Sequence, residues 1–469
     1  MQKLPAKIIR LAEIIKENGG RALLVGGCVR DFLMGVEPKD FDVEVYGVEP
    51  RRLREILERF GKVDAVGEAF TVYKIGNNLD VSLPRRERKT GRGHRGFTIE
   101  GDPQMSFEEA CRRRDFTINA ILQDILTEEI IDPFDGRKDI ERKLIRVVAR
   151  ETFVEDSLRV LRAAQFAARF DFQIQVETAE LCRSIDLSDL PKERIWGEFE
   201  KLLLKADKPS IGLKWFYDLK IADKVFPELT ALVGVPQNPE WHPEGDLDVH
   251  TLLVVDEARK LIEDLPYPKR VAVMLGALCH DFGKPATTRF FEGAWRSYGH
   301  DEVGVQPTIT FLDRLGIFTF DGYDVRNQVI ELVRNHLRPG EFYKNRDDLG
   351  DGAFRRLAGR VELDLLYRVA KADSLGRNAP WLPPEKLKTA EAQEWFIEKV
   401  KDLKVERAAP QPILMGRHLI ELGLKPSPQF KEILDAVYEM QLDERVRNLE
   451  EAIAEARKII EKGESSAEN

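Results

Sequence analysis

The spacing of apolar residues alternates along the chain between a helical and a strand period. Apolar residues recur three to four positions apart over residues 6–18, which predicts a helix, whereas Ala22 to Val25 form a continuous apolar run, which predicts a buried strand. A Gly-Gly turn and a short helix follow, and alternating segments at 71–76 and 78–84 predict further short strands. This order of elements predicts a small mixed sheet near the N-terminus.

Helical spacing dominates the rest of the chain. Ser106 with Glu109 three positions later forms a capping box, and the amphipathic pattern over 151–170 predicts one continuous helix. Prolines and a change of composition over 226–243 indicate a domain boundary. The sequence therefore predicts an α/β head followed by all-α domains. We expect these domains to span residues 1–145, 146–235, 236–380 and 381–469.

Composition narrows the class of protein. The chain has 469 residues, of which 43% are hydrophobic and 33% charged, and no apolar run approaches the roughly 20 residues of a membrane span. Its four cysteines are scattered without CxxC pairs, which argues against disulfides and structural zinc and favours the cytoplasm. The net charge of −9 means that any nucleic-acid contact must come from a local patch. Residues 85–101, rich in arginine and glycine, are predicted to form a mobile basic loop that serves this purpose.

The stretch from residue 21 to 47 carries the first candidate chemistry. Gly26 and Gly27 allow backbone N–H groups to approach a phosphate closely. Asp40 and Asp42 lie two positions apart on a predicted strand, so their carboxylates share one face and suit Mg²⁺. Either feature alone is more often a plain turn or a solvated strand end. Together they favour nucleotidyl transfer.

In the order GGxVRDxLxG…DxD, these residues resemble the signature of the nucleotidyltransferase superfamily that includes DNA polymerase β. More closely, they resemble its class II tRNA nucleotidyltransferase and bacterial poly(A) polymerase branch. The resemblance implies a polymerase-β-like sheet, Mg²⁺ held by Asp40 and Asp42, and triphosphate contacts by Gly27 and Arg30. Asp80, on a neighbouring predicted strand, is left out because relatives do not reliably carry an acid there.

Two further segments extend the resemblance. RRDFTINA (113–120) matches the family's second motif and implies that Arg114 contacts the nucleotide. EDSLR (155–159) matches the motif in which Asp156 and Arg159 hydrogen-bond the Watson–Crick edge of the incoming base. One carboxylate and one guanidinium complement the amine donor and ring-nitrogen acceptor that cytosine and adenine share. The plain alternative is an Asp–Arg salt bridge on a helix.

The motif continues along the same predicted helix and into the next. Arg162 is expected to assist at the triphosphate, while Gln165 stands where many relatives carry another arginine. Arg194 and Glu198 on the helix predicted over 193–204 are expected to support the nucleotide-selecting residues.

Histidines cluster in the second half of the chain. The pattern H…HD…H…H…D, which includes His300 and His336, resembles the HD phosphohydrolase superfamily. The resemblance implies a divalent metal and phosphoester hydrolysis, in a domain that relatives carry in either an active or a degenerate form. The expected metal ligands are His250, His280, Asp281 and Asp373.

These motifs predict an enzyme that adds CCA to tRNA 3′ ends from CTP and ATP with Mg²⁺. We expect it to be cytoplasmic and not associated with a membrane. Residues 61–70 lack the basic segment of poly(A) polymerases, and the basic stretch at 85–101 favours complete CCA addition. The alternatives are addition of A only or of CC only, then poly(A) polymerase activity, then an HD-domain phosphodiesterase with a vestigial head. The last alternative is a protein that only binds RNA. The oligomeric state stays open.

Overall fold

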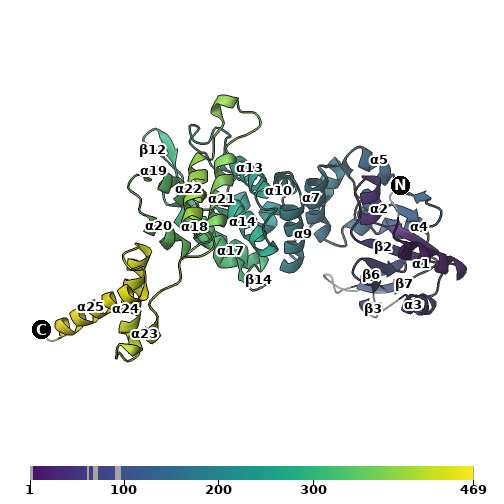
Figure 1. Ribbon diagram of the computed structural model, residues 1–469. Coiled ribbons are helices and arrows are strands. Elements are labelled where there is room, and N and C mark those ends of the chain that lie inside the picture. The colour runs from purple at the N-terminus through teal and green to yellow at the C-terminus, as the bar shows by residue number, and fades with distance from the viewer. Residues whose placement is uncertain (1–3, 61–62, 67–71, 90–96, 468–469) are drawn as a thin grey trace. The chain divides into compact units, whose positions relative to one another are not determined.

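The computed structural model describes residues 4–60, 63–66, 72–89 and 97–467 and divides into two compact units, 1–230 and 231–469 (Figure 1). No helix among the described residues is long and apolar enough to cross a membrane. All four cysteines are buried, and none of them forms a disulfide bond.

A mixed seven-stranded sheet forms the centre of the first unit, which confirms the predicted α/β head. Its strand order is β3-β4-β5-β2-β1-β8-β9. Strands β2 and β5 run parallel, and all other neighbouring strands in the sheet pair antiparallel. The strands are β1 (Arg21–Val25), β2 (Phe41–Tyr46), β3 (Val63–Val66), β4 (Val72–Ile75), β5 (Leu79–Ser82), β8 (Leu122–Asp124) and β9 (Ile130–Ile131).

Alternation along β1 divides the core of this unit in two. Leu24 belongs to a large cluster with α1 (Ala6–Glu17) and α3 (Pro50–Glu58), whereas Leu23 and Val25 belong to a second cluster on the other face. Because both faces are covered, β1 is apolar throughout, which explains its continuous hydrophobic run.

The predicted loop at 85–101 is wrong at its two ends. Residues 85–89 form β6 (Arg85–Lys89), which pairs antiparallel with β7 (Phe97–Gly101), and residues 90–96 lie outside the described part of the chain. The glycines that favoured a loop are concentrated between the two strands, while Phe97, Thr98 and Ile99 are strong strand formers.

The helix predicted over 151–170 is also interrupted. It divides into α6 (Arg150–Phe153) and α7 (Leu158–Phe170), so Asp156 lies before α7 and accepts a hydrogen bond from the Leu158 N–H (3.2 Å). Asp and Ser compete for backbone N–H groups and favour helix starts over helix interiors, a signal that the apolar spacing masked.

The rest of the first unit is mostly helical. Helix α7 packs against α9 (Lys192–Lys205) and α10 (Pro209–Asp218), and Ser106 caps α4 (Phe107–Arg112) by accepting from the Glu109 N–H. The remaining elements are α2 (Gly27–Leu33), η1 (Thr117–Asn119), α5 (Gly136–Glu141), β10 (Leu144–Ile145), β11 (Gln173–Ile174), α8 (Val176–Ser184), α11 (Ile221–Val225) and α12 (Pro227–Thr230).

Helices α13 (Leu247–Lys260), α14 (Tyr267–Cys279), α18 (Val325–Asn335) and α21 (Leu363–Leu375) form the core of the second unit (Figure 1). Gly276 lets α14 approach its neighbours, because a Cβ there would lie 3.0 Å from Leu332 and 3.3 Å from Val369.

Around that core lie helices α15 (Lys284–Thr287), α16 (His300–Val303), α17 (Val305–Leu315), α19 (Arg338–Lys344), α20 (Asp351–Ala358), η2 (Pro384–Lys386) and α22 (Glu391–Asp402). Helices α23 (Gly416–Glu421), α24 (Pro428–Leu442) and α25 (Leu449–Ala467) follow and share a hydrophobic cluster of their own. Two hairpins that the sequence did not predict interrupt the helices, β12 (Arg289–Phe291) with β13 (Ala294–Arg296), and β14 (Thr319–Phe320) with β15 (Tyr323–Asp324).

Candidate functional site

A cavity of about 490 Å³ in the first unit brings together most of the residues predicted to bind nucleotide. Among its lining residues are Gly26, Gly27, Arg30, Asp42, Arg114, Asp115, Asn119, Asp156, Arg159, Arg162, Gln165, Arg194 and Glu198. Residues from five separate elements thus meet at one site, as the motifs predict. Asp40 precedes β2 and is not among the lining residues.

The turn before α2 makes room for an arginine. Gly26 has a φ of +71°, and a Cβ at this position would lie 2.9 Å from the Nη1 atom of Arg114. The Arg114 Nη2 atom lies 3.7 Å from Glu44 Oε1, while its buried Nε has no hydrogen-bond partner in the described part of the chain. The guanidinium is therefore fixed at the turn with one N–H group left for a ligand.

Carboxylates gather at the carboxyl-terminal side of this turn. Asp42 in β2 lies directly beside Asp80 in β5, because the parallel register pairs the two residues. Desolvation raises the pKa of Asp42; the Arg114 charge opposes this rise, and the negative charges of Asp80 and Asp40 add to it. A divalent cation would relieve that repulsion, so the donor set fits Mg²⁺. Asp80 was excluded from the sequence-based site, and strand pairing is what brings it there.

Arg30 is held largely by the protein itself. Its guanidinium donates to Asn119 Oδ1 (2.6 Å) and Asp31 Oδ1 (2.6 Å), and it lies 4.4 Å from the ring centroid of Phe170. The side chain is 4% exposed. Arg30 therefore joins α2 to η1 and α7, and its contact with a triphosphate stays a prediction.

The two residues predicted to select the base do not pair with each other, so the simple Asp–Arg salt bridge is wrong. Asp156 Oδ2 accepts from Arg194 Nη2 (2.9 Å), and Arg159 donates to the carbonyl oxygens of Thr152 (2.7 Å) and Arg113 (2.7 Å). Burial raises the pKa of Asp156, but the hydrogen bond and charge of Arg194, the Leu158 N–H and the charge of Arg159 together outweigh it, so the net pKa is lowered. Each side chain is thus held in place by a different neighbour.

Helix α9 supports α7 at a second point. Arg162 donates from Nε to Asp115 Oδ2 (2.8 Å), and its Nη1 lies 3.5 Å from Glu198 Oε1. Arg194 and Glu198 thus contact Asp156, just before α7, and Arg162 within it, as expected of residues that support this helix, whereas selection of the nucleotide by Asp156 and Arg159 stays a prediction. Gln165 is 1% exposed, and its Nε2 has no hydrogen-bond partner among the described residues.

The second unit gathers the predicted metal ligands at the ends of four long helices and at α16. Asp281 lies at the centre: its Oδ2 is 3.1 Å from His280 Nε2, and its Oδ1 is 3.2 Å from His300 Nε2. His336 Nε2 lies 3.3 Å from His300 Nε2, and His250 Nε2 lies 3.2 Å from Asp373 Oδ1. These six residues form a compact, buried cluster.

Hydrogen bonds orient the imidazoles toward the cluster. The Nδ1 atoms of His280, His300 and His336 each lie 2.6–2.8 Å from the carbonyl oxygen three residues earlier, which leaves every Nε2 for a metal. Burial lowers the pKa of His336 to about 4, so this imidazole is neutral. His280 Nε2 and both Asp281 carboxylate oxygens are fully buried, and the contacts described for them are with other ionisable groups of this site. The donor set fits one or two divalent ions sharing Asp281.

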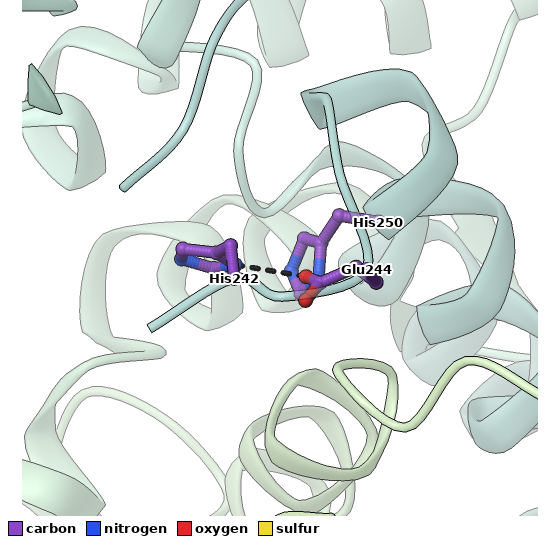
Figure 2. A group of neighbouring side chains, drawn as sticks. All are labelled: His242, Glu244 and His250. Atoms are coloured by element: carbon purple, nitrogen blue, oxygen red, sulfur yellow. Dashed lines mark hydrogen bonds and ion pairs between the residues drawn. The ribbon is translucent and has the colours of Figure 1, made fainter. Parts of the chain in front are cut away.

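His250 is oriented differently from the other three histidines. Figure 2 shows the Glu244 carboxylate between the imidazoles of His242 and His250, with Oε1 2.9 Å from His242 Nδ1 and 2.7 Å from His250 Nδ1. Burial raises the pKa of Glu244, but these hydrogen bonds outweigh it and lower the pKa to about 2. Sequence reasoning missed Glu244, since an acid in a proline-rich connection carries no recognisable motif.

Two cations near the cluster were also missed. Lys284 Nζ lies 2.7 Å from Asp281 Oδ2, and Arg377 Nη2 lies 3.2 Å from Asp373 Oδ1. Arg377 lies one helical turn after Asp373, a spacing that could have indicated the pair. A cavity of about 500 Å³, which both cations line, opens onto the cluster.

Comparisons with known proteins match different families to the two units that carry these two sites. The family model described as poly A polymerase head domain matches residues 22–146, the probable RNA and SrmB- binding site of polymerase A matches 171–232, and the HD domain matches 247–378.

Curated relatives cover most of the chain. A multifunctional CCA protein of Stenotrophomonas maltophilia is 39% identical over 373 residues, covering 76% of this chain and 86% of the relative. One of Xanthomonas euvesicatoria is 36% identical and covers 82% and 92%.

Solved structures share the fold. The Bacillus stearothermophilus CCA-adding enzyme in complex with CTP has a TM-score of 0.65 at 21% identity, covering 99% of this chain and all of that one. The Thermotoga maritima CCA-adding enzyme complexed with tRNA has a TM-score of 0.55 at 20% identity, covering 97% and 94%.

Proposed function

This chain belongs to the family of multifunctional CCA proteins, and from that membership we propose how its residues carry out the family's reaction. It is a tRNA nucleotidyltransferase that adds cytidine and adenosine nucleotides to the tRNA 3′ end from CTP and ATP. The tRNA 3′-hydroxyl oxygen forms a bond to the α-phosphorus, the bond to the pyrophosphate oxygen breaks, and pyrophosphate leaves.

Asp40 and Asp42 would hold Mg²⁺ for this reaction, and Asp80 lies beside Asp42. Mg²⁺, when bound there, lowers the pKa of the attacking hydroxyl and stabilises negative charge on the phosphate. Arg114 binds the triphosphate near Gly27, with Arg30 and Arg162 completing the positive surroundings. Four buried cysteines that form no disulfide bond support a cytoplasmic location.

The observation that carries the proposal is how Asp156 and Arg159 are held. Arg194 restrains the carboxylate, two backbone carbonyls restrain the guanidinium, and both side chains line the cavity that also contains Asp42. A restrained acceptor next to a restrained donor serves as a protein template for the edges of cytosine and adenine. Uracil and guanine present the opposite pattern and are rejected.

Incorporation of labelled CTP and ATP, separately and together, tests this function. The substrates are tRNA transcripts that end before the CCA sequence, after its two cytidines, and after the terminal adenosine. Stepwise addition that stops at the complete end is expected. Addition of A only or of CC only would indicate a split activity, unlimited A addition would indicate a poly(A) polymerase, and no incorporation would refute the assignment of the head.

A second activity is supported by the histidine cluster of the second unit. We propose phosphoester hydrolysis there: a water oxygen forms a bond to phosphorus, the ester P–O bond breaks, and the leaving oxygen takes up a proton. A divalent metal, when bound, would activate the water and stabilise phosphate charge. The expected ligands are His250, His280, Asp281 and Asp373, with His300 and His336 available for a second ion. Ring opening of 2′,3′-cyclic AMP to 2′- or 3′-AMP by Asp40→Ala protein would support this activity, and its absence with Mn²⁺, Co²⁺ and Ni²⁺ would refute it.

A further inference from the structure

The β12–β13 hairpin exposes aromatic side chains beside the cavity of the second unit. Phe290, Phe291 and Tyr298 are 62%, 53% and 72% exposed, and Trp295 is 36% exposed. Nothing in the proposed hydrolysis requires them. Large apolar side chains gathered on a short exposed element indicate a binding surface.

The hairpin is rigid by construction. Phe290 pairs across the strands with Trp295, and their rings meet edge to face at 5.2 Å. Glu292 and Gly293 form the two-residue turn with φ values of +47° and +79°, the conformation that closes tight hairpins. The aromatic rings are therefore held in place without a ligand.

The aromatic surface continues into the cavity. Trp295 and Tyr298 line it from the hairpin, and Trp241, which is half exposed, lines it from the segment before α13. Phe290 extends the same surface away from the metal cluster through its contact with Trp295. The rings thus lead from the metal ligands outward to solvent.

Positive charge accompanies the rings. Arg296, opposite Arg289 in the strand register, lines the cavity, and its buried Nε has no hydrogen-bond partner in the described part of the chain. Between residues 289 and 298 the only acid is Glu292. Lys344 and Arg377 line the same cavity. Alternating rings and cations are the chemistry that holds single-stranded nucleic acid, whose bases stack while its phosphates pair.

We infer that the β12–β13 hairpin is a base-stacking platform that holds the last nucleotides of a single-stranded RNA while its 3′-terminal phosphate reaches the metal cluster. This inference rests on the hydrolysis proposed above and names its substrate as an RNA end. The cavity of about 500 Å³ suits one nucleotide. Phe290, which is not among its lining residues but contacts Trp295 across the strands, is left to stack a preceding base, while Phe291 lies on the other face of the hairpin.

Kinetics on two substrates test the inference with the full-length protein. The substrates are an RNA octamer ending in a 2′,3′-cyclic phosphate and the mononucleotide 2′,3′-cyclic AMP. Phe290→Ala is expected to lower kcat/KM for the octamer about tenfold or more, the loss of stacking on one base. The mononucleotide rate should stay within about twofold. The matched control is Phe318→Ala, half exposed before β14, which should change neither rate.

Equal rates for variant and wild-type protein on the octamer would overturn the inference, as would an equal loss on both substrates. Photocrosslinking separates this from failure of the hydrolysis itself, because it needs no turnover. An octamer with 4-thiouridine at its last three positions is expected to crosslink to peptides containing residues 289–298, and less after Tyr298→Ala. Crosslinks confined to residues 1–230 would refute the platform. The exposed aromatic side chains would then bind a different class of partner. Crosslinks at the hairpin without hydrolysis would support the platform and refute the phosphohydrolase.

Discussion

At the scale of single residues, the second unit shows how one buried acid prepares a metal ligand. Glu244 Oε1 lies 2.9 Å from His242 Nδ1 and 2.7 Å from His250 Nδ1, and Glu244 Oε2 has no hydrogen-bond partner among the described residues. A carboxylate on Nδ1 raises the basicity of Nε2, which is the atom that faces Asp373.

Glu244→Gln is accordingly expected to weaken metal binding about tenfold, because a neutral amide polarises His250 less than a carboxylate does. Titration with Co²⁺, followed by the visible absorption of the histidine-bound ion, measures the affinity without any turnover. The control is Glu240→Gln, an exposed acid in the same connection. Unchanged Co²⁺ affinity in Glu244→Gln would show that backbone packing alone orients His250.

Asp115 is a buried acid in the first unit that holds neighbouring side chains in place, as Glu244 does in the second. It is buried and accepts from Arg162 Nε (2.8 Å) and Asn119 Nδ2 (2.9 Å). Burial raises its pKa, yet Arg162 and Asn119 outweigh this and lower the pKa below the ordinary 3.8. Its ionised form therefore stabilises the fold above pH 3.8, and that stability is lost as the pH falls through the lower folded-state pKa.

Asp115→Asn is expected to reduce the free energy of unfolding by about 2 kcal/mol at pH 7, the value of a buried hydrogen bond to a charged group. The difference from wild-type protein should shrink steadily below pH 3.8. Urea unfolding at pH 7 and at several acidic pH values measures it, with exposed Asp207→Asn as the control. A difference independent of pH would contradict the assigned ionisation of Asp115.

At the scale of elements, helix α9 holds the segment that precedes α7 in place. Arg194 in α9 reaches Asp156, which lies outside α7 because that helix begins at Leu158. A residue outside a helix lacks the restraint of the helical backbone and depends on such side-chain contacts.

Arg194→Met is therefore expected to raise the KM for both CTP and ATP about tenfold, because the Asp156 carboxylate is no longer held toward the base. Incorporation of a single nucleotide into a tRNA transcript measures KM and kcat. Glu193→Gln, exposed on the same helix, is the matched control. If KM stays unchanged for both nucleotides, α9 does not position the template residue.

At the scale of the whole molecule, the two sites lie in separate compact units, and no side chain is shared between them among the described residues. Each unit has its own helices around its own acidic and basic residues. The two proposed reactions should therefore be separable by substitution.

Asp42→Asn is expected to lower nucleotide incorporation roughly a thousandfold, since a metal supplies several kcal/mol of charge stabilisation. It should leave hydrolysis of 2′,3′-cyclic AMP unchanged. Asp281→Asn should have the reverse effect, and EDTA should abolish both reactions. Loss of both activities in either variant would contradict separate sites.

The sequence by itself determined the chemistry and most of the elements. The motifs GG, DFD, RRD and EDSLR resemble those of one family, and that resemblance predicted one nucleotide site for Gly27, Asp42, Arg114 and Asp156, which all line one cavity. Apolar periodicity likewise predicted β1, β2, β4 and β5 of the head and several helices of both units. Such patterns are local, and local patterns are what a sequence displays.

Only the tertiary structure decided which distant residues meet. The pairing of Asp42 with Asp80 depends on strand register, and the Arg162–Asp115 and Arg194–Asp156 contacts depend on how α7 packs against its neighbours. The contact between Glu244 and His250 depends on the path of a connection without regular structure. These contacts are set by packing of the whole chain, and no single segment of sequence encodes them.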